Sequence, residues 1–280
     1  MAPTRALNTA NAVARPAFCR HPIFSAQRAH NQMTQSYHYH NGSEVAGCIV
    51  LVDGDKGGVG KSFTARSITG HLLSSGTRVH CFDGDYRNGS LERHYRNHCA
   101  VQRLDLRSED GFSDFYDTLD MIEPRTVVLC DLPAGAGARV ESEAERLRLN
   151  RQFGREIIHV WVADPGEDSV RQFKELQFVA DPTRTVFIIN MRGRSEPERF
   201  TIWLRSQVRA SFIAAGGHEL KLPHMPVRLH DRIALAQAPF LVDPVPSGLC
   251  RSDILSLRIF NQQVATELAP LFNLILGASS

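Results

Sequence analysis

The residues that could most clearly do chemistry form one glycine-rich segment, Lys56-Gly57-Gly58-Val59-Gly60-Lys61-Ser62. Glycines let a backbone approach a phosphate closely, so several N–H groups can donate to it, and a following helix N-terminus adds positive charge. At this spacing we expect Lys61 to reach the β- and γ-phosphates of a nucleotide and Ser62 to hold Mg²⁺. The residues expected to contact the nucleotide are Gly57, Gly58, Val59, Gly60, Lys61, Ser62 and Phe63.

Two elements must position this segment, a strand before it and a helix after it. Residues 48–52 are all apolar and read as a buried strand, while Phe63, Ile68 and Leu72 share one face of a helix over 63–73. Strand, glycine loop and helix form the arrangement in which backbone N–H groups cradle phosphates. The alternative, a glycine-rich turn without a ligand, is disfavoured by this setting.

One residue departs from the general loop pattern G-x-x-x-x-G-K-[ST], because Asp55 stands where that pattern has its first glycine. A carboxylate beside a triphosphate is unfavourable, since both are negatively charged. We therefore expect Asp55 to point away from the nucleotide or to pair with Lys56, and otherwise to weaken nucleotide binding.

Carboxylates follow two further strands. Residues 79–82 read as a strand that runs into Asp83 and Asp85, and residues 126–131 read as a short strand that ends in Asp131. In a parallel sheet, residues just past the carboxyl ends of strands face the same crevice. These acids could therefore reach Mg²⁺ and the attacking water, although Asp83-Gly84-Asp85 could also be a polar turn.

A lysine before the glycine pair, K-G-G-x-G-K-[ST], is the mark of the deviant Walker A loop, and Asp131-Leu132-Pro133-Ala134-Gly135 is written as in the MinD branch. Roughly residues 45–275 therefore resemble the ParA/MinD family of P-loop ATPases. The resemblance implies a slow ATPase that binds ATP with Mg²⁺, dimerises face to face around ATP, and is activated by a protein partner. It also implies that Lys56 crosses the dimer interface, that Asp85 orients water, and that Asp83 and Asp131 serve the metal.

The remaining pattern predicts the fold class. Apolar runs at 101–106, 157–162 and 185–190 read as strands, and 111–122 and 169–180 read as helices with one apolar face. Gly76 is placed to end the helix that follows the loop. Alternating strands and helices predict an α/β fold, namely a doubly wound, mostly parallel sheet with helices on both faces.

Asn190 comes at the end of the strand 185–190. A side-chain amide can donate to and accept from one base at once, and by the family resemblance Asn190 would read the adenine edge. Capping of the following turn is an equal alternative.

The late part of the chain gives weaker signals. Residues 192–209 carry five arginines and read as an amphipathic surface helix rather than a nucleic-acid face, although a non-specific DNA contact stays possible. Residues 222–231 resemble the family's late strand and loop, with a helix beginning near Asp231. The terminal helix, 252–275, has an apolar face, and the last 20 residues contain no Lys or Arg. We therefore expect it to pack on the core and not to bind membranes.

The amino-acid composition narrows the range of functional classes that the protein could belong to. With 32 basic and 30 acidic residues, the charge is too balanced to indicate a dedicated nucleic-acid binder. No apolar run is long enough for a membrane span, and six scattered cysteines read as buried residues of a reducing compartment, so we expect a cytoplasmic protein.

Residues 1–43 contain no acid and read as a disordered extension before an ATPase domain at 44–280. A transit peptide, or a natural start at Met33, are alternatives for this extension.

Three functions stay open. The first is a switch in DNA or cargo partitioning or positioning, as the ParA/MinD resemblance implies. The second is an accessory ATPase of plasmid conjugative transfer, whose members share the Lys61-Ser62-Phe63 ending and a strand–helix unit like 101–131. The third is a nucleotide-dependent interaction protein that does not hydrolyse ATP, which Asp55 makes conceivable. An iron–sulfur carrier is disfavoured because Cys250 has no C-x-x-C partner.

Overall fold

The computed structural model describes residues 47–54, 56–86, 88–175, 180–191 and 197–277. The expectations for the extension 1–43, for Asp55 and for residues 176–179 of the helix predicted at 169–180 lie outside the described residues. The described residues fall within one compact unit, 44–280. The domain boundary at residue 43 stays a prediction.

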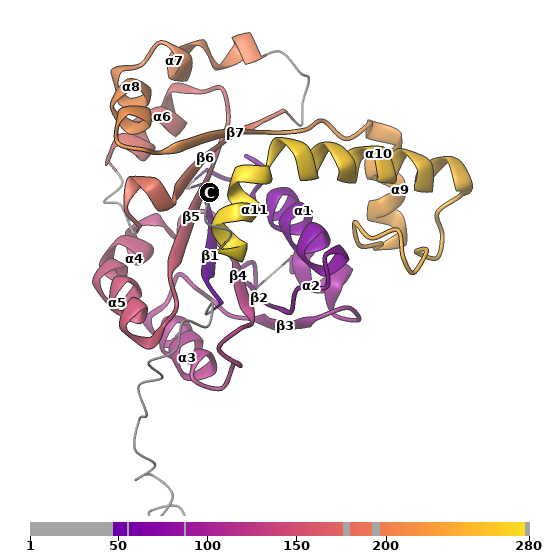
Figure 1. Cartoon of the computed structure of the whole chain (residues 1–280), viewed down its shortest axis with the longest axis horizontal. Coiled ribbons are helices and arrows are strands. Elements are labelled where there is room, and N and C mark those ends of the chain that lie inside the picture. The colour runs from indigo at the N-terminus through magenta and orange to yellow at the C-terminus, as the bar shows by residue number, and fades with distance from the viewer. Residues whose placement is uncertain (1–46, 55, 87, 176–179, 192–196, 278–280) are drawn as a thin grey trace, which may run out of the picture. The chain divides into compact units, whose positions relative to one another are not determined.

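The described strands form one parallel sheet of seven strands in the order β3-β2-β4-β1-β5-β6-β7 (Figure 1). Their central members are apolar on both faces, as expected for a sheet that is covered on both sides. This confirms the predicted doubly wound α/β class. The strands are β1 Ile49–Asp53, β2 Val79–Asp83, β3 Ala100–Arg103, β4 Val127–Asp131, β5 Ile157–Ala163, β6 Thr185–Asn190 and β7 His218–Leu222.

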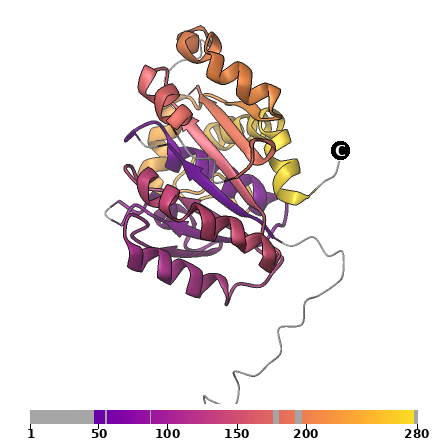
Figure 2. The same ribbon diagram turned by 90° about the vertical axis from the view of Figure 1, so that its left-hand side faces the viewer.

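Helices cover both faces of the sheet, with one hydrophobic cluster on the first face and two on the second. One face carries α1 Lys61–Ser74, α2 Ser90–Tyr95, α9 Val227–Ala236, α10 Arg251–Glu267 and α11 Ala269–Leu276. The other face, which turns to the viewer in Figure 2, carries α3 Glu109–Leu119, α4 Gly137–Ser142, α5 Ala144–Leu149, α6 Glu167–Glu175, α7 Thr201–Leu204 and α8 Gln207–Ala214. Short 3₁₀ turns occupy Asn150–Phe153, Pro182–Arg184 and Pro197–Phe200.

The end of α1 follows the expected glycine cap. Gly76 has a φ of 75°, its N–H donates to Leu73 O at 3.0 Å, and the N–H of Thr77 donates to Leu72 O at 2.9 Å. This is the hydrogen-bond pattern of a Schellman motif, which favours glycine because its backbone adopts a left-handed conformation. The prediction for Gly76 is confirmed.

Three predictions for the late part of the chain were wrong in detail. The terminal helix is two helices, α10 and α11, separated at Leu268, because Pro270 has no N–H to continue the hydrogen-bond ladder. The helix expected near Asp231 already begins at Val227, directly after Pro226. The arginine-rich stretch forms the short helices α7 and α8 instead of one helix, with 192–196 outside the described residues.

The Tyr95 side chain connects three segments of the chain in the core on the side of the sheet that carries α1. Its side chain is fully buried, and its hydroxyl donates to Arg66 O at 2.7 Å and accepts from the Phe240 N–H at 3.0 Å. Replacing Tyr95 with Phe leaves a buried carbonyl and a buried N–H without this partner, so we expect the free energy of unfolding to fall by about 1–3 kcal/mol. Urea denaturation measures this loss. Tyr86→Phe, at a side chain that is 62% exposed, is the matched control, and equal stability of both variants would contradict the assignment.

Candidate functional site

The glycine loop lies at the centre of the sheet, where β1 ends between β4 and β5. The chain crosses to one side of β1 and later to the other, and in open α/β sheets ligands bind at such a switch point. Gly60 precedes α1 with a φ of 104°, and a Cβ there would lie 2.1 Å from Asn190 Nδ2. Glycine is therefore required at Gly60 both for its backbone conformation and for space.

Lys61 folds back over the loop that it follows. The side chain is only 7% exposed, and its Nζ donates to Gly54 O at 2.5 Å and to Lys56 O at 3.0 Å. Two carbonyls at the start of the loop thus fix the ammonium group against the loop. This arrangement holds a positive charge where the loop's N–H groups would meet a phosphate.

The acids that end β2 and β4 lie side by side at the same edge of the sheet. Asp83 and Asp131 are register partners, and Asp131 is also paired with Val52 of β1 next to the loop. The loops beyond them pack together, since the Gly84 N–H donates to Asp131 O at 2.9 Å. A Cβ on Gly57 would lie 3.8 Å from Ala134, so the segment after β4 also reaches the glycine loop.

Asp131 is a buried carboxylate, only 1% exposed, and neither oxygen accepts a hydrogen bond from the described residues. Burial raises its pKa to about 7; the nearby Asp83 and Asp85 raise it as well, while the Ser62 hydroxyl and the Lys61 ammonium oppose the shift. Ser62 is thus beside the carboxylate, although not at full hydrogen-bond geometry. Mg²⁺ prefers one or two protein oxygens together with water and phosphate, so Asp131 and Ser62 fit this ion.

Asp83 and Asp85 hold the turn that follows β2. Asp83 is fully buried, and its oxygens accept from the N–H groups of Asp85 at 3.2 Å and Glu92 at 2.9 Å. Burial still raises its pKa, despite these donors. Asp85 is half-buried and accepts from the Asn88 N–H at 3.0 Å. Asp83 therefore shapes the turn and the start of α2 with both oxygens, and the predicted metal role of Asp83 stays a prediction.

Lys56 is the first residue of the glycine-rich segment, but its side chain does not point at that segment. Its Nζ lies 2.7 Å from Asp164 Oδ2, just past the end of β5. Asp164 also accepts from Ser169 Oγ at 2.8 Å and from the Gly166 N–H at 3.0 Å. Partial burial raises the pKa of Asp164, but the hydrogen bonds from Lys56, Ser169 and Gly166 together leave that pKa below its usual value. The hydrogen bond to Asp164 raises the pKa of Lys56.

Two further predicted residues support the loop from behind. The Nδ2 of Asn190 donates to Val59 O at 2.5 Å, so its amide contacts the glycine loop in this structure. Its reading of adenine stays a prediction. The Phe63 side chain lies in the core, with ring centroids 5.4 Å from Phe240 and 5.7 Å from Phe260. The side chain of Phe63 is therefore not available to a nucleotide, and only its backbone could contact one.

Sequence reasoning missed Asp164, Asp53 and His159. Asp164 follows β5 as directly as Asp83 and Asp131 end their strands, so the strand-end rule could have found it. Asp53 and His159 are both fully buried, with Asp53 Oδ2 3.1 Å from His159 Nε2. The available signals for this pair were an acid at the end of one apolar run, Asp53, and a polar residue inside another, His159.

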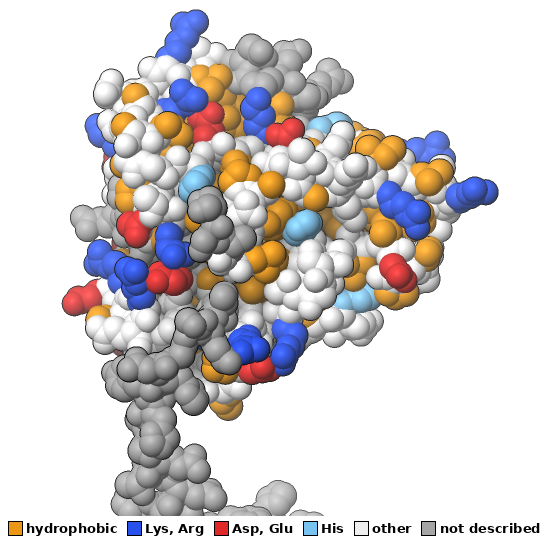
Figure 3. All heavy atoms as spheres, viewed as in Figure 1, with side chains coloured by type: hydrophobic (Ala, Val, Ile, Leu, Met, Phe, Trp, Pro, Cys, Tyr) orange, Lys and Arg blue, Asp and Glu red, His pale blue; other side chains and the backbone are white. Residues whose placement is uncertain are grey.

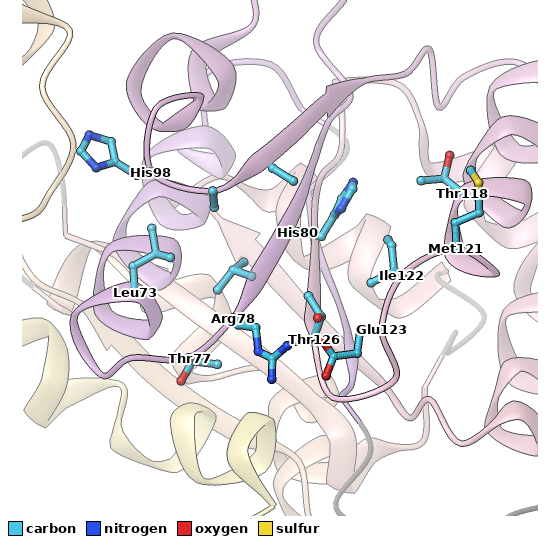
Figure 4. Close-up of a pocket in the computed structure, with 13 residues that line it drawn as sticks. Leu73, Thr77, Arg78, His80, His98, Thr118, Met121, Ile122, Glu123 and Thr126 are labelled. Atoms are coloured by element: carbon cyan, nitrogen blue, oxygen red, sulfur yellow. Dashed lines mark hydrogen bonds and ion pairs between the residues drawn. The ribbon is translucent and has the colours of Figure 1, made fainter.

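A pocket of about 550 Å³ lies elsewhere, at the amino ends of β2, β3 and β4 (Figure 4). Arg78 and Glu123 form an ion pair there, and His80, His98 and Met121 are among the other lining residues. Because the strands are parallel, this edge is opposite to the glycine loop. The nucleotide site is therefore assigned from the loop and not from this pocket.

The fold and the site define a P-loop nucleotide-binding protein with a deviant Walker A loop. The family model "ATPase MipZ" matches residues 48–131, the segment from β1 to Asp131. Together with the acids that end β2 and β4, this match supports a ParA/MinD-type P-loop ATPase.

Among curated proteins, the chain is similar to protein MobD of Acidithiobacillus ferrooxidans, with 26% identity over 190 residues, which cover 68% of this chain and 83% of MobD. Among solved structures, similar chains include the MinD cell division protein of Aquifex aeolicus (16% identity, TM-score 0.42, 76% of this chain and 95% of that chain). The cell division ATPase MinD of Pyrococcus furiosus has 16% identity and a TM-score of 0.43, over 78% and 100% of the two chains.

A nucleotide-binding protein from Archaeoglobus fulgidus, solved in complex with ADP, is also similar, with 16% identity and a TM-score of 0.36 over 79% of this chain and 89% of that chain. Within the described residues, no helix combines the length and the apolar character that a membrane crossing requires.

Proposed function

We propose that this protein is an ATP-dependent switch that binds and slowly hydrolyses ATP, dimerises on ATP, and acts in DNA or cargo partitioning or positioning in the cytoplasm. The observation that carries the proposal is the buried Asp131 carboxylate, which lies beside Ser62 and Lys61 and accepts no hydrogen bond from the described residues. A buried charge of this kind is costly unless a cation and its water shell approach it.

The proposed roles follow from the positions of the side chains. The backbone from Gly57 to Phe63 would surround the phosphates, with Lys61 contributing its charge. Ser62 and Asp131 would hold Mg²⁺, which neutralises phosphate charge when bound. Asp85, in the turn beyond β2, would orient the attacking water.

Lys56 is the residue that would link two copies of the chain. Its ion pair with Asp164 is solvent-exposed, with Lys56 48% and Asp164 24% exposed at the side chain. Exposed ion pairs contribute little to stability because water and salt screen them, so a triphosphate on a facing copy could replace Asp164 as the partner of Lys56. Lys56 would then leave Asp164 of its own chain and contact the nucleotide of the other copy. This change of partner would couple ATP binding to dimerisation.

Substitution of Lys56 and Asp164 tests this role. We expect Lys56→Ala to bind Mg·ATP but to stay monomeric with ATP, and to lose hydrolysis because the charge at the facing nucleotide is no longer neutralised. Asp164→Asn releases Lys56 and is expected to dimerise at lower ATP concentration. Light scattering and phosphate release measure both. A Lys56→Ala protein that dimerises and hydrolyses ATP as the unmodified protein does would refute the switch.

The strand–helix unit before β4 favours a second candidate, an accessory ATPase of plasmid conjugative transfer. The Lys61-Ser62-Phe63 ending and the β3–α3 unit both resemble the small Walker ATPases of such systems. Relaxase or secretion genes beside the gene for this protein would favour transfer, and a gene for a centromere-binding partner would favour partitioning.

The proposed partners are an activating protein and non-specific DNA. On the face drawn in Figure 3, basic side chains are scattered and acidic ones lie among them, so a DNA contact there would be weak.

A third candidate, nucleotide-dependent interaction without hydrolysis, rests on Asp55. Bound ATP without phosphate release, even with DNA and a partner added, would favour it.

A further inference from the structure

A buried Asp–His pair lies directly behind the glycine loop. Asp53 is the last residue of β1, His159 belongs to the neighbouring strand β5, and both are 0% exposed. His159 Nε2 lies 3.1 Å from Asp53 Oδ2. Side chains alternate along a strand, and Ile49 and Leu51 pack in the core under α3 to α5, so Asp53 points to that face and away from α1.

The pair acts on Gly54, the first residue after β1. The other oxygen of Asp53, Oδ1, accepts the Gly54 N–H at 2.6 Å. Gly54 has a φ of 150°, and a Cβ there would lie 2.5 Å from Val162 O on β5, so only glycine fits. The carbonyl of Gly54 in turn accepts from Lys61 Nζ at 2.5 Å. A continuous set of contacts therefore leads from His159 through Asp53 and Gly54 to the Lys61 ammonium.

We propose that Asp53 and His159 are positioning residues for Lys61, and that they set the affinity of the loop for a nucleoside triphosphate. The inference rests on the proposed ATP-binding function. His159 donates its Nε2–H to Asp53, which fixes the carboxylate, and the carboxylate fixes Gly54, whose carbonyl directs Lys61. A fully buried carboxylate and imidazole are costly in a sheet interior, where a leucine would pack more favourably, so a positional role explains their presence.

The pair acts through geometry and not through its charge. A negative carboxylate at the end of β1, close to the glycine loop, would by itself oppose a triphosphate. Loss of the His159 donor should therefore weaken nucleotide binding, because Gly54 and Lys61 are then no longer held in position. This is expected although Asp53 itself is not substituted.

Two substitutions of similar size separate the donor from the packing. Glutamine can place an N–H close to the position of imidazole Nε2, whereas leucine cannot donate. We expect His159→Leu to raise the Kd for Mg·ATP at least tenfold, and His159→Gln to raise it less than threefold. Calorimetry measures both, with thermal unfolding in the absence of nucleotide to confirm that each variant is folded.

A double-mutant cycle with Lys61 supplies a readout that a general loss of stability would not move. If the pair acts through Lys61, His159→Leu has no further effect on Mg·ATP affinity when Lys61 is already Ala. Equal losses in both backgrounds, or unchanged affinity of His159→Leu, would overturn the proposal. If the unmodified protein does not bind Mg·ATP, the proposed function fails with it, whereas binding that is insensitive to His159 removes this inference alone.

The unmodified protein gives an independent test should His159→Leu not fold. The ¹⁵N chemical shifts of the imidazole report which ring nitrogen carries the proton. We expect the proton on Nε2 of His159, the nitrogen that faces Asp53. A proton on Nδ1 with a bare Nε2 would contradict the proposal, because His159 would then have no N–H to donate to Asp53.

Discussion

Replacing Lys61 with Ala is expected to weaken Mg·ATP binding by a factor of about 100 and to abolish hydrolysis. The side chain is 7% exposed and is directed against the loop by the carbonyls of Gly54 and Lys56. A hydrogen bond from a charged donor contributes about 1.5–3 kcal/mol, and each 1.4 kcal/mol is a factor of ten in affinity. Calorimetric titration and a phosphate-release assay give the two values.

Lys221→Ala is the matched control for this substitution, because Lys221 is an exposed lysine on the edge strand β7. It removes the same side chain and charge far along the sheet from β1 and should leave ATP affinity unchanged. Tight Mg·ATP binding by Lys61→Ala would contradict the assignment of the loop as the phosphate site.

Replacing Asp131 with Asn is expected to make the nucleotide-free protein more stable and at the same time to remove its response to Mg·ATP. No described residue donates a hydrogen bond of full geometry to this buried carboxylate, so its charge opposes folding until a cation binds. In EDTA at pH 8 we expect the free energy of unfolding to rise by about 1–3 kcal/mol, since the amide still leaves buried polar atoms without partners. Mg·ATP should stabilise the unmodified protein and not the variant.

The pH dependence of this effect has a definite sign. The pKa of Asp131 is raised from 3.8 to about 7 in the folded protein, so the folded state binds more protons than the unfolded state between these values. The stability of the unmodified protein in EDTA therefore falls as pH rises from about 4 to 7, by at most about 4 kcal/mol from this group. The advantage of Asp131→Asn should grow over the same range and then level off.

Asp114→Asn is the control for Asp131→Asn, because Asp114 is an exposed acid on α3. Its stability should stay within about 0.5 kcal/mol of the unmodified protein. A destabilised Asp131→Asn that still responds to Mg·ATP would show that Asp131 is a structural group and not a metal ligand.

The sequence allowed the fold class and the centre of the site to be predicted, because both depend on local patterns. Apolar runs that are buried on both faces locate β1, β4, β5 and β6, and acids directly after strands locate Asp83 and Asp131. The glycine pattern located the loop, since Gly60 needs both a left-handed backbone and space beside Asn190.

The contacts that the sequence could not reveal join residues far apart in the chain. Lys56 and Asp164 are 108 positions apart, and Asp53 and His159 are 106 apart. Only the order of the sheet, which places β5 beside β1, brings them together. The break between α10 and α11 was accessible in principle, because Pro270 is visible in the sequence, but the apolar face continues through it.

The most direct test of the account is the mass of the full chain in solution with Mg·ATP, with Mg·ADP and without nucleotide, by light scattering. We predict a mass of about twice the 31.2 kDa of one chain with Mg·ATP, and the mass of one chain in the other two conditions. The same mass under all three conditions would contradict an ATP-driven switch, whatever the affinity of the loop for the nucleotide.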